Sequence, residues 1–376
     1  MKILLTGGGS GGHFYPVIAI VEELNKMIQD NRLIDVETFY MSPSPYNAGV
    51  LFNTNIVYKK NYAGKIRRYF SIMNLVDFFK TGYGVIQSLW EVFLIYPDVV
   101  FGKGGYASFP ALFAARVLRI PVIIHESDSV PGKVNVWAGK FAHRIAVSYP
   151  DAAKFFPADK VAYTGNPIRK DFFFSLTTNA HEYLKLDPKI PTLLFIGGSL
   201  GSKRINEVLL EALPRLLEKY QVIHQTGKNN LEEVTSIAEA ILVNSNYKNR
   251  YRPYAYMDSL TLRSAAGAAN LIVSRAGSAI FEIAAWGVPA VIIPIADSNG
   301  NHQLKNAFAY ARTGAAVVIE EANLTGNMMS AEINRILSNS ELALSMKEST
   351  KQFVKPEAAK IIADEILKTA LSHDTK

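Results

Sequence analysis

Short apolar runs that end in glycines alternate with amphipathic stretches along most of the chain. The first run, Lys2–Thr6, leads into a glycine cluster, after which apolar positions recur at helical spacing as far as Ile28. A buried strand followed by an amphipathic helix gives this pattern. The order repeats at Asp98–Phe101 and at Thr192–Ile196, each of which runs into glycines and then into a further apolar stretch.

The remaining apolar runs extend this alternation over both halves of the chain. They predict strands at Asp35–Met41, Asn55–Lys60, Val122–His125, Arg144–Ser148, Val161–Thr164, Gln221–Gln225, Tyr251–Tyr254, Leu271–Ser274, Val288–Pro294 and Ala316–Ile319. Such alternation is typical of an α/β protein with two doubly wound parallel sheets, whose ligands bind at the strand carboxyl ends. Gly165-Asn166-Pro167 interrupts the pattern, so we predict domains at residues 1–167 and 168–351, and an amphipathic helix at Glu357–Leu371.

Composition narrows the class of protein. The chain has 376 residues, which suits two domains, with 49% hydrophobic and 19% charged residues, as in a folded protein. The absence of cysteine excludes disulfides, thiolate metal sites and cysteine nucleophiles. The apolar run after Lys2 is too short for a signal peptide, and no stretch reaches the roughly 18 apolar residues of a membrane span. A formal charge of +7 favours anionic partners, although a generally basic protein would show the same excess.

The glycine clusters are candidate anion sites. A glycine turn that directs bare backbone N–H groups along a helix N-terminus suits a phosphate. His13 is the first side chain after the first turn that exchanges a proton near neutral pH. The same segment fits a tight strand-to-helix turn packed for its own sake, but the repetition of the theme favours a nucleotide site.

A second candidate phosphate site lies where Arg275–Ala279 opens the predicted helix Ile280–Trp286. Glu282 in its first turns is either an ordinary favourable charge near a positive helix end or an acceptor for a vicinal diol such as ribose.

The segment Lys59–Tyr96 mixes cations with bulky apolar side chains. Its cations are Lys59, Lys60, Lys65, Arg67, Arg68 and Lys80, and its apolar residues include Ile66, Tyr69, Phe70, Ile72, Met73, Leu75, Phe78, Phe79, Trp90, Phe93, Leu94 and Ile95. An amphipathic helix of this kind can lie on an anionic membrane interface. Each aromatic residue taken singly is more typical of a core, but for Ile66–Phe79 as a whole we favour membrane contact.

Several signatures are absent from the sequence. It lacks the P-loop lysine pattern, an Asp-x-Asp pair, zinc-site histidine spacing and the modules that bind RNA or DNA. We therefore expect no metal, no nucleic-acid partner, and phosphate charge that is neutralised by helix dipoles and arginine. A nicotinamide dehydrogenase is disfavoured because Asp35 begins the second strand, whereas the ribose-binding acid should end it.

Eight ordered motifs carry a family resemblance. They are Gly9-Ser10-Gly11-Gly12-His13, Gly102-Lys103-Gly104-Gly105-Tyr106, His125-Glu126, Gly165-Asn166-Pro167-Ile168-Arg169, Gly197-Gly198-Ser199-Leu200-Gly201, His224-Gln225-Thr226-Gly227-Lys228, Ser274-Arg275-Ala276-Gly277 and Asn301-His302-Gln303-Leu304-Lys305-Asn306. Over nearly its whole length the chain resembles the MurG-type lipid II synthases of glycosyltransferase family 28. These bacterial enzymes transfer N-acetylglucosamine (GlcNAc) from UDP-GlcNAc onto the muramoyl-pentapeptide diphospho-undecaprenol lipid of peptidoglycan synthesis.

The resemblance implies a GT-B fold, in which two Rossmann-like domains face a central cleft and a C-terminal helix at about residues 352–372 packs back on the first domain. It implies inverting transfer without a metal or other cofactor, by a peripheral protein at the cytoplasmic face of the cell membrane. The acceptor lipid would approach the first domain, and the Lys59–Phe79 region would contact the anionic membrane surface. Other cell-wall synthesis proteins are expected partners.

The resemblance also assigns roles by motif position, with His13 as general base on the acceptor hydroxyl. The donor-binding residues would be Ser10, Gly11, Gly12, Asp128, Arg169, Ser199, Met257, Ser278, Ala279, Ile280, Phe281, Glu282 and Gln303, and the acceptor-side residues Gly104, Gly105, Tyr106, His125 and Glu126. Ser199 would lie at the UDP diphosphate, Met257 beside the uracil and Gln303 at the GlcNAc hydroxyls.

Three departures from the family pattern concern single positions. The family usually has Asn in place of Asp128 and Gln in place of Leu200, and the span Arg275–Glu282 is one residue shorter than usual. Other functions stay open: a GT-B enzyme acting on another acceptor, a UDP-GlcNAc 2-epimerase, or a non-catalytic nucleotide-sugar-binding membrane partner. His13 could also only orient the acceptor.

Overall fold

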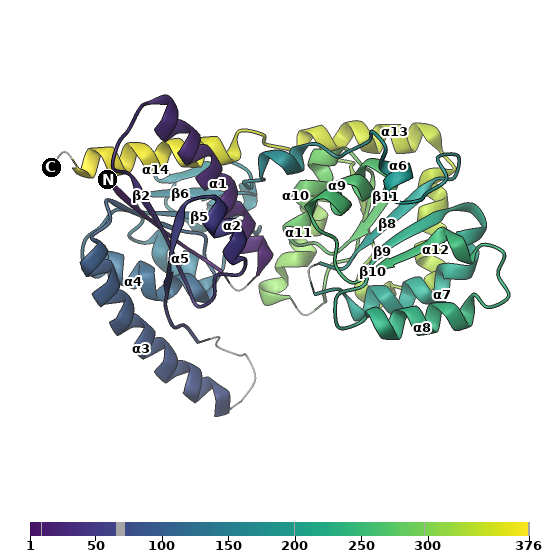
Figure 1. Cartoon of the computed structure of the whole chain (residues 1–376), viewed down its shortest axis with the longest axis horizontal. Coiled ribbons are helices and arrows are strands. Elements are labelled where there is room, and N and C mark those ends of the chain that lie inside the picture. Colours follow the sequence, from purple (N-terminus) through teal and green to yellow (C-terminus); the bar gives the residue numbers. More distant parts are fainter. Residues whose placement is uncertain (9, 65–71, 199, 297, 375–376) are drawn as a thin grey trace. The chain divides into compact units, whose positions relative to one another are not determined.

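The chain folds into two compact units, each built on one parallel sheet. The computed structural model describes residues 1–8, 10–64, 72–198, 200–296 and 298–374. Unit 1 comprises Met1–Arg169 and Lys355–Lys376, and unit 2 comprises Lys170–Val354 (Figure 1). The chain therefore leaves unit 1 once and returns to it with its last helix.

Unit 1 contains a seven-stranded sheet in the order β3-β2-β1-β4-β5-β6-β7, with every pair of neighbours parallel. Its strands are β1 (Lys2–Thr6), β2 (Glu37–Ser42), β3 (Ile56–Lys60), β4 (Val99–Gly102), β5 (Val122–Glu126), β6 (Arg144–Val147) and β7 (Val161–Tyr163). Its helices are α1 (Gly11–Asp30), α2 (Ala48–Asn53), α3 (Ile72–Ile95), η1 (Tyr106–Ser108), α4 (Phe109–Val117), α5 (Lys133–Gly139), η2 (Pro150–Phe155) and α14 (Ala358–Asp374).

Helices cover both faces of this sheet because alternate strand residues point to opposite sides. Ile3 and Leu5 of β1 pack in one cluster with α1, α2 and α14, whereas Leu4 packs in another with α3, α4 and α5. A strand that is buried on both faces has a nearly continuous apolar sequence, so these strands could be predicted from the apolar runs.

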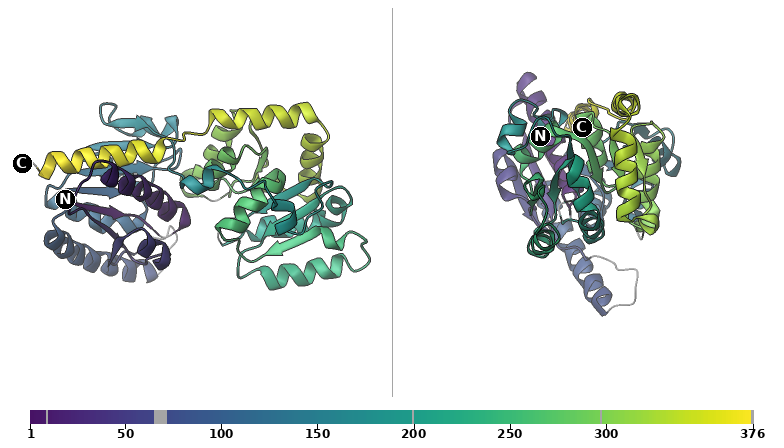
Figure 2. Two further views of the ribbon diagram at one scale, coloured as in Figure 1. Left: turned by 45° about the horizontal axis from the view of Figure 1, so that its top comes forward. Right: turned by 90° about the vertical axis from the view of Figure 1, so that its right-hand side faces the viewer.

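Helix α3 has an unusual distribution of side chains. It packs along α4, and its first turns reach beyond the sheet (Figures 1 and 2). Its inward positions include Asp77, Ser88, Val92 and Ile95, all buried, while many of its other large apolar side chains are half exposed or more. The exposed residues are Met73, Leu75, Val76, Phe78, Phe79, Tyr83, Ile86, Trp90, Phe93 and Leu94. Within the described part of the chain, no helix is both long enough and apolar enough to cross a bilayer.

Unit 2 contains a six-stranded parallel sheet in the order β10-β9-β8-β11-β12-β13. Its strands are β8 (Thr192–Ile196), β9 (Gln221–Gln225), β10 (Tyr251–Tyr254), β11 (Ala269–Ser274), β12 (Ala290–Ile292) and β13 (Ala316–Val318). Its helices are η3 (Lys170–Phe173), α6 (Ala180–Tyr183), α7 (Lys203–Lys219), α8 (Leu231–Ile241), η4 (Lys248–Arg250), α9 (Ser259–Ala268), α10 (Ala279–Trp286), η5 (Asn299–Asn301), α11 (His302–Ala311), η6 (Glu321–Asn323), α12 (Gly326–Leu337), α13 (Ser340–Ser349) and η7 (Thr350–Gln352).

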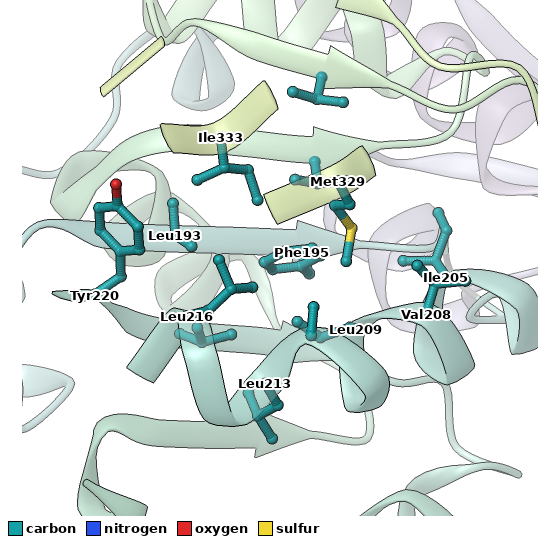
Figure 3. Packing of buried hydrophobic residues seen from close by; sticks show 14 of the residues in the cluster. Leu193, Phe195, Ile205, Val208, Leu209, Leu213, Leu216, Tyr220, Met329 and Ile333 are labelled. Carbon is teal, nitrogen blue, oxygen red and sulfur yellow. The ribbon is translucent and has the colours of Figure 1, made fainter. Parts of the chain in front are cut away.

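One face of this second sheet forms a large apolar core with α7 and α12. Figure 3 shows Leu193 and Phe195 of β8 between side chains of these two helices. The contributing side chains include Ile205, Val208, Leu209, Leu213 and Leu216 of α7 and Met329 and Ile333 of α12. The predicted α/β class with two parallel sheets is confirmed, and every predicted strand lies within two residues of an observed one at both ends.

Candidate active site

Helix α1 begins at Gly11, within the first glycine cluster, and carries His13 in its first turn. Ser10 is the extended residue before the helix, and its backbone carbonyl accepts hydrogen bonds from the N–H groups of His13 and Phe14. Its hydroxyl makes no capping bond and instead lies 3.0 Å from Nδ1 of His13. Because no acidic residue stands in the first turn, the positive end of the α1 dipole has no carboxylate of its own there.

The second glycine turn lies against the His13 imidazole. Gly104 and Gly105 both adopt left-handed backbone angles, with φ of +85° and +76°. A Cβ added to Gly105 would stand 3.4 Å from Nε2 of His13, and one added to Gly104 would stand only 2.6 Å from Nδ2 of Asn135. Tyr106 follows in η1 and is half-buried. The two predicted turns thus converge on His13.

His125 and Glu126 end β5 beneath this region, and both are buried. Nε2 of His125 lies 3.1 Å from the carbonyl of Gly165 and 3.2 Å from Oγ of Ser148. Burial, together with the positive charge of Lys103, holds the pKa of His125 well below its ordinary value, so the imidazole is neutral. These two acceptor-side residues can therefore act only through their neighbours.

Asp128 and Arg169 lie nearer the surface. Asp128 follows β5, is half-buried, and its backbone N–H donates to Oε1 of Glu126 over 2.9 Å. The Arg169 guanidinium stands 4.5 Å from the ring centre of Tyr15 in α1, a distance typical of a cation–π contact. Both predicted donor residues therefore belong to unit 1.

In unit 2, the third glycine turn is tied to Met257 through one amide side chain. Gln225 ends β9; its Nε2 donates to the carbonyl of Gly198, and its Oε1 accepts from the backbone N–H of Met257. The Met257 side chain itself is buried. Ser199, predicted at the diphosphate, lies outside the described residues.

The start of α10 separates the predicted residues Ser278 to Glu282 into two groups. The side chains of Ile280 and Phe281 are buried, and their backbone N–H groups already donate to the carbonyls of Gly277 and Ser278. Ser278 and Ala279 stand at the helix start, where the Ser278 side chain makes no capping bond. Glu282 is half-buried in the first turn.

A buried arginine joins three loops at the carboxyl edge of the second sheet. Arg275 donates to Oγ of Ser202 over 2.7 Å, to Oε1 of Glu321 over 2.7 Å and to the carbonyl of Ile293 over 3.2 Å. Although burial opposes it, hydrogen bonds from the Ala296 N–H and from Arg275 hold the pKa of Glu321 below its usual range.

The same edge of the sheet positions Gln303, the residue predicted at the GlcNAc hydroxyls. Its Oε1 accepts from the backbone N–H of Ile295 over 3.1 Å. This bond fixes the amide orientation, and the two N–H donors of the side chain are on Nε2.

Gln225, Arg275 and Lys103 stand within the sequence motifs but are not among the predicted site residues. Each follows or ends a strand at the carboxyl edge, which is the signal that points to them. The partners of Gln225 and Arg275 are 18 to 73 residues away in the chain, so spacing alone does not reveal the contacts. Among the described residues, no group of three or more His, Asp or Glu side chains is arranged to hold a metal ion.

Two family models match the chain. Residues 3–147 match the glycosyltransferase family 28 N-terminal domain, and residues 192–362 match the C-terminal domain of the same family. A relative from Bacillus cereus, UDP-N-acetylglucosamine–N-acetylmuramyl-(pentapeptide) pyrophosphoryl-undecaprenol N-acetylglucosamine transferase 2, is 34% identical over 367 residues, covering 97% of this chain and 99% of the relative.

Solved structures agree in fold. MurG of Acinetobacter baumannii has a TM-score of 0.72 at 25% identity, covering 98% of this chain and 99% of its own. A putative UDP-N-acetylglucosamine 2-epimerase from Listeria monocytogenes has a TM-score of 0.70 at 15% identity, covering 99% and 96%, and this likeness shows the fold alone. The fold is of the GT-B class, and the predicted resemblance is confirmed: the chain is a glycosyltransferase that belongs to glycosyltransferase family 28.

Proposed function

We propose that this glycosyltransferase moves N-acetylglucosamine from UDP-GlcNAc to the muramoyl-pentapeptide diphospho-undecaprenol lipid, with inversion at the anomeric carbon. The observation that carries the proposal is the setting of His13, between an uncapped helix start and the second glycine turn. The name of the Bacillus cereus relative, similar over nearly the whole chain, supports this donor and this acceptor.

In the proposed reaction His13 removes the proton from the acceptor hydroxyl as the oxygen attacks the anomeric carbon. When Nδ1–H of His13 donates to Oγ of Ser10, Nε2 is the unprotonated ring nitrogen and carries the lone pair that a base needs. Gly105 on that side of the ring has no side chain that would block an approaching hydroxyl. Ser10, Gly11, Gly12, Gly104 and Tyr106 would then border the reacting groups.

Unit 2 would hold the donor. The backbone N–H groups of Ser278 and Ala279 stand at the positive end of α10, which suits the diphosphate and the charge that grows on departing UDP. Glu282 would accept from the ribose hydroxyls, Gln303 would donate to the sugar, and the backbone at Met257 would border the uracil. Because Ile280 and Phe281 are committed to the core, their part would be structural.

We further propose that unit 1 binds the cytoplasmic surface of the cell membrane through α3, as a peripheral protein. An apolar stripe at helical spacing that faces solvent is typical of a helix lying in a lipid interface. Exposed Lys80 on α3 would favour anionic headgroups. The basic positions 65, 67 and 68 of the predicted Lys59–Phe79 region lie outside the described residues.

The proposal is tested by UDP release from UDP-GlcNAc, with and without a short-chain analogue of the acceptor lipid. We expect release that depends on the lipid, and we expect His13→Ala to lower turnover by roughly 10²–10⁴-fold while UDP binding stays nearly intact. His143→Ala, which replaces an exposed histidine of unit 1, is the matched control and should keep wild-type turnover.

Two results would contradict the proposal. Release of UDP together with N-acetylmannosamine in the absence of acceptor would identify an epimerase. If the protein binds the donor but releases no UDP in response to the lipid, it is either a transferase that uses another acceptor or a protein that only binds the nucleotide sugar.

A further inference from the structure

A buried cation lies under the two glycine turns of unit 1. Lys103, the second residue of the turn after β4, is only 1% exposed, and its Nζ has no hydrogen-bond partner among the residues that the structure describes. Its backbone N–H donates to the carbonyl of Thr6 at the end of β1. A Cβ added to Gly7 would stand 2.9 Å from the Lys103 Cβ, so the first glycine turn lies directly on this side chain.

The carboxylate of Glu126 organises the loop that follows β5. Its Oε1 accepts from the backbone N–H of Asp128 over 2.9 Å. Its Oε2 accepts from the backbone N–H of Gly132 over 3.0 Å and from Nδ2 of Asn135 over 2.9 Å. All three partners are donors, so both oxygens act only as acceptors, as in an ionised carboxylate. Protonation would turn one oxygen into a hydroxyl and weaken the bonds that hold the loop.

Few charges are available to keep this buried carboxylate ionised. Asp128 is negative and disfavours a second charge beside it, and His125 is neutral. The Lys103 ammonium interacts favourably with both carboxylates, Glu126 and Asp128, through space rather than by direct contact. Lys103 is thus a buried cation placed to offset the cost of burying Glu126.

We propose that Lys103 is a positioning residue of the transfer reaction: its buried ammonium keeps Glu126 ionised, and Glu126 in turn holds loop 126–132, which carries Asp128, against the second glycine turn. Asn135 links the two parts, because its amide bonds Glu126 while its Nδ2 is the atom against which Gly104 packs. The side chain of Lys103 does not touch substrate. This inference rests on the proposed function only for its effect on catalysis.

The charges of the pair predict a window of pH. Burial lowers the pKa of Lys103 to about 8, and burial with the Asp128 charge raises the pKa of Glu126 to about 7. The charged pair is therefore most populated between these two values: below them Glu126 takes up a proton, and above them Lys103 loses one. Removing the cation must raise the pKa of Glu126 further, which moves the loss of the loop to higher pH.

The direct test is carboxyl titration of the whole chain by NMR, with ¹³C-labelled glutamate and the Glu126 signal assigned by Glu126→Gln. We expect Glu126 to titrate near neutral pH, at higher pH in Lys103→Met, and near its wild-type value in Lys103→Arg, which retains the charge. An unchanged titration in Lys103→Met would overturn the proposal. Because this readout needs no substrate, it stands even if lipid-dependent UDP release is never seen.

Activity supplies the second test. In Lys103→Met, kcat/KM should fall roughly tenfold or more at pH 7.5, with its acidic limb moved to higher pH, and Lys103→Arg should restore most of it. A uniform loss at every pH would indicate a structural role alone and would overturn the proposal. Lys26→Met, which removes an exposed lysine of α1, is the matched control and should match wild type.

A double variant covers the case in which Lys103→Met does not fold. Adding Lys103→Met to Glu126→Gln removes both buried charges and should cost no activity beyond that of Glu126→Gln alone, because Lys103 acts through Glu126. A clear further loss of activity in the double variant, beyond that of Glu126→Gln alone, would refute that dependence.

Discussion

At the scale of single residues, buried polar groups fix the loops that we expect to meet substrate. His224 of β9 shows how: its Nδ1 lies 2.8 Å from the hydroxyl of Tyr251 and its Nε2 lies 3.0 Å from Oδ1 of Asn206. Asn206 donates with its nitrogen to the carbonyl of Thr226, so its oxygen faces His224 as an acceptor. Nε2 therefore carries the proton, and Nδ1 accepts from the tyrosine. A second proton would sit on Nδ1 and point at the Tyr251 hydroxyl. That hydroxyl would then have to rotate and accept a hydrogen bond instead of donating one.

This network predicts acid sensitivity of unit 2. Burial lowers the pKa of His224 to about 3, below the ordinary value of 6.5 that applies once the chain unfolds. Between these values the unfolded chain binds a proton that the folded chain refuses, so stability is present above pH 6.5 and falls as the pH drops. The slope is about 1.4 kcal/mol per pH unit for this one proton.

The measurement is hydrogen exchange of β8 and β9 amides between pH 4 and 7, corrected for intrinsic rates. His224→Gln should be less stable than wild type at pH 7 but should lose stability less steeply as the pH falls. Equal slopes in both proteins would show that His224 does not carry the effect.

Contacts between individual side chains that lie far apart in the chain are the feature that the sequence predicts least well. Motif positions located His13, Gln303 and the glycine turns, but nothing in the spacing indicates that Arg275 pairs with Glu321, 46 residues further along the chain. That pairing depends on which loops the strand order brings to one edge of the sheet. The burial of Ile280 and Phe281 likewise depends on how α10 packs rather than on its composition.

At the scale of elements, α3 differs from every helix that simply covers a sheet. Phe79, Tyr83, Ile86 and Trp90 follow one another at steps of three or four residues, and all are more than half exposed. An apolar stripe of this spacing reads the same in the sequence whether it faces a core or solvent. Only the packed structure shows that the core side of α3 consists of Val92 and Ile95 together with polar residues such as Ser88, while this stripe faces solvent.

The proposed role of α3 predicts binding to anionic vesicles. Phe79→Ser combined with Ile86→Ser should weaken binding to phosphatidylglycerol vesicles at least roughly tenfold, because each burial of such a side chain is worth about 1.5–3 kcal/mol. Co-sedimentation measures the effect. The matched control is Ile34→Ser with Phe52→Ser, two residues of unit 1 that are each 83% exposed but lie outside α3. Equal losses in both double variants would remove α3 from the interface.

At the scale of the whole molecule, the last helix completes the first unit. Ile362, Ala363, Ile366, Leu367 and Ala370 of α14 are buried in the cluster that α1 forms on the first sheet. The amphipathic pattern predicted this helix, and the apolar runs predicted the strands of both sheets, because these elements are defined by short-range periodicity. Where the last helix packs is not encoded at short range, and we expected it from the family resemblance rather than from the pattern.

Because α14 packs in the core of unit 1, truncating one of its buried side chains should lower the stability of that unit alone. Ile366→Ala should destabilise unit 1 by about 2–5 kcal/mol, as expected when a large apolar residue in a core is truncated. Hydrogen exchange should then speed up in β1 and β4 but not in β8 and β11. Ile361→Ala on the same helix is the control, since that side chain is 50% exposed. Faster exchange in both units would show that they unfold together.

This return of the chain to unit 1 has a consequence for how the protein is made. A ribosome synthesises every strand of the first sheet early, yet the helix that seals one side of it emerges only after all of unit 2. Unit 2 can reach its final packing while one apolar face of unit 1 is still exposed to solvent. Newly made chains therefore expose this apolar face until the last helix is complete, and a chain that stops before α14 should be destabilised in the half that is translated first.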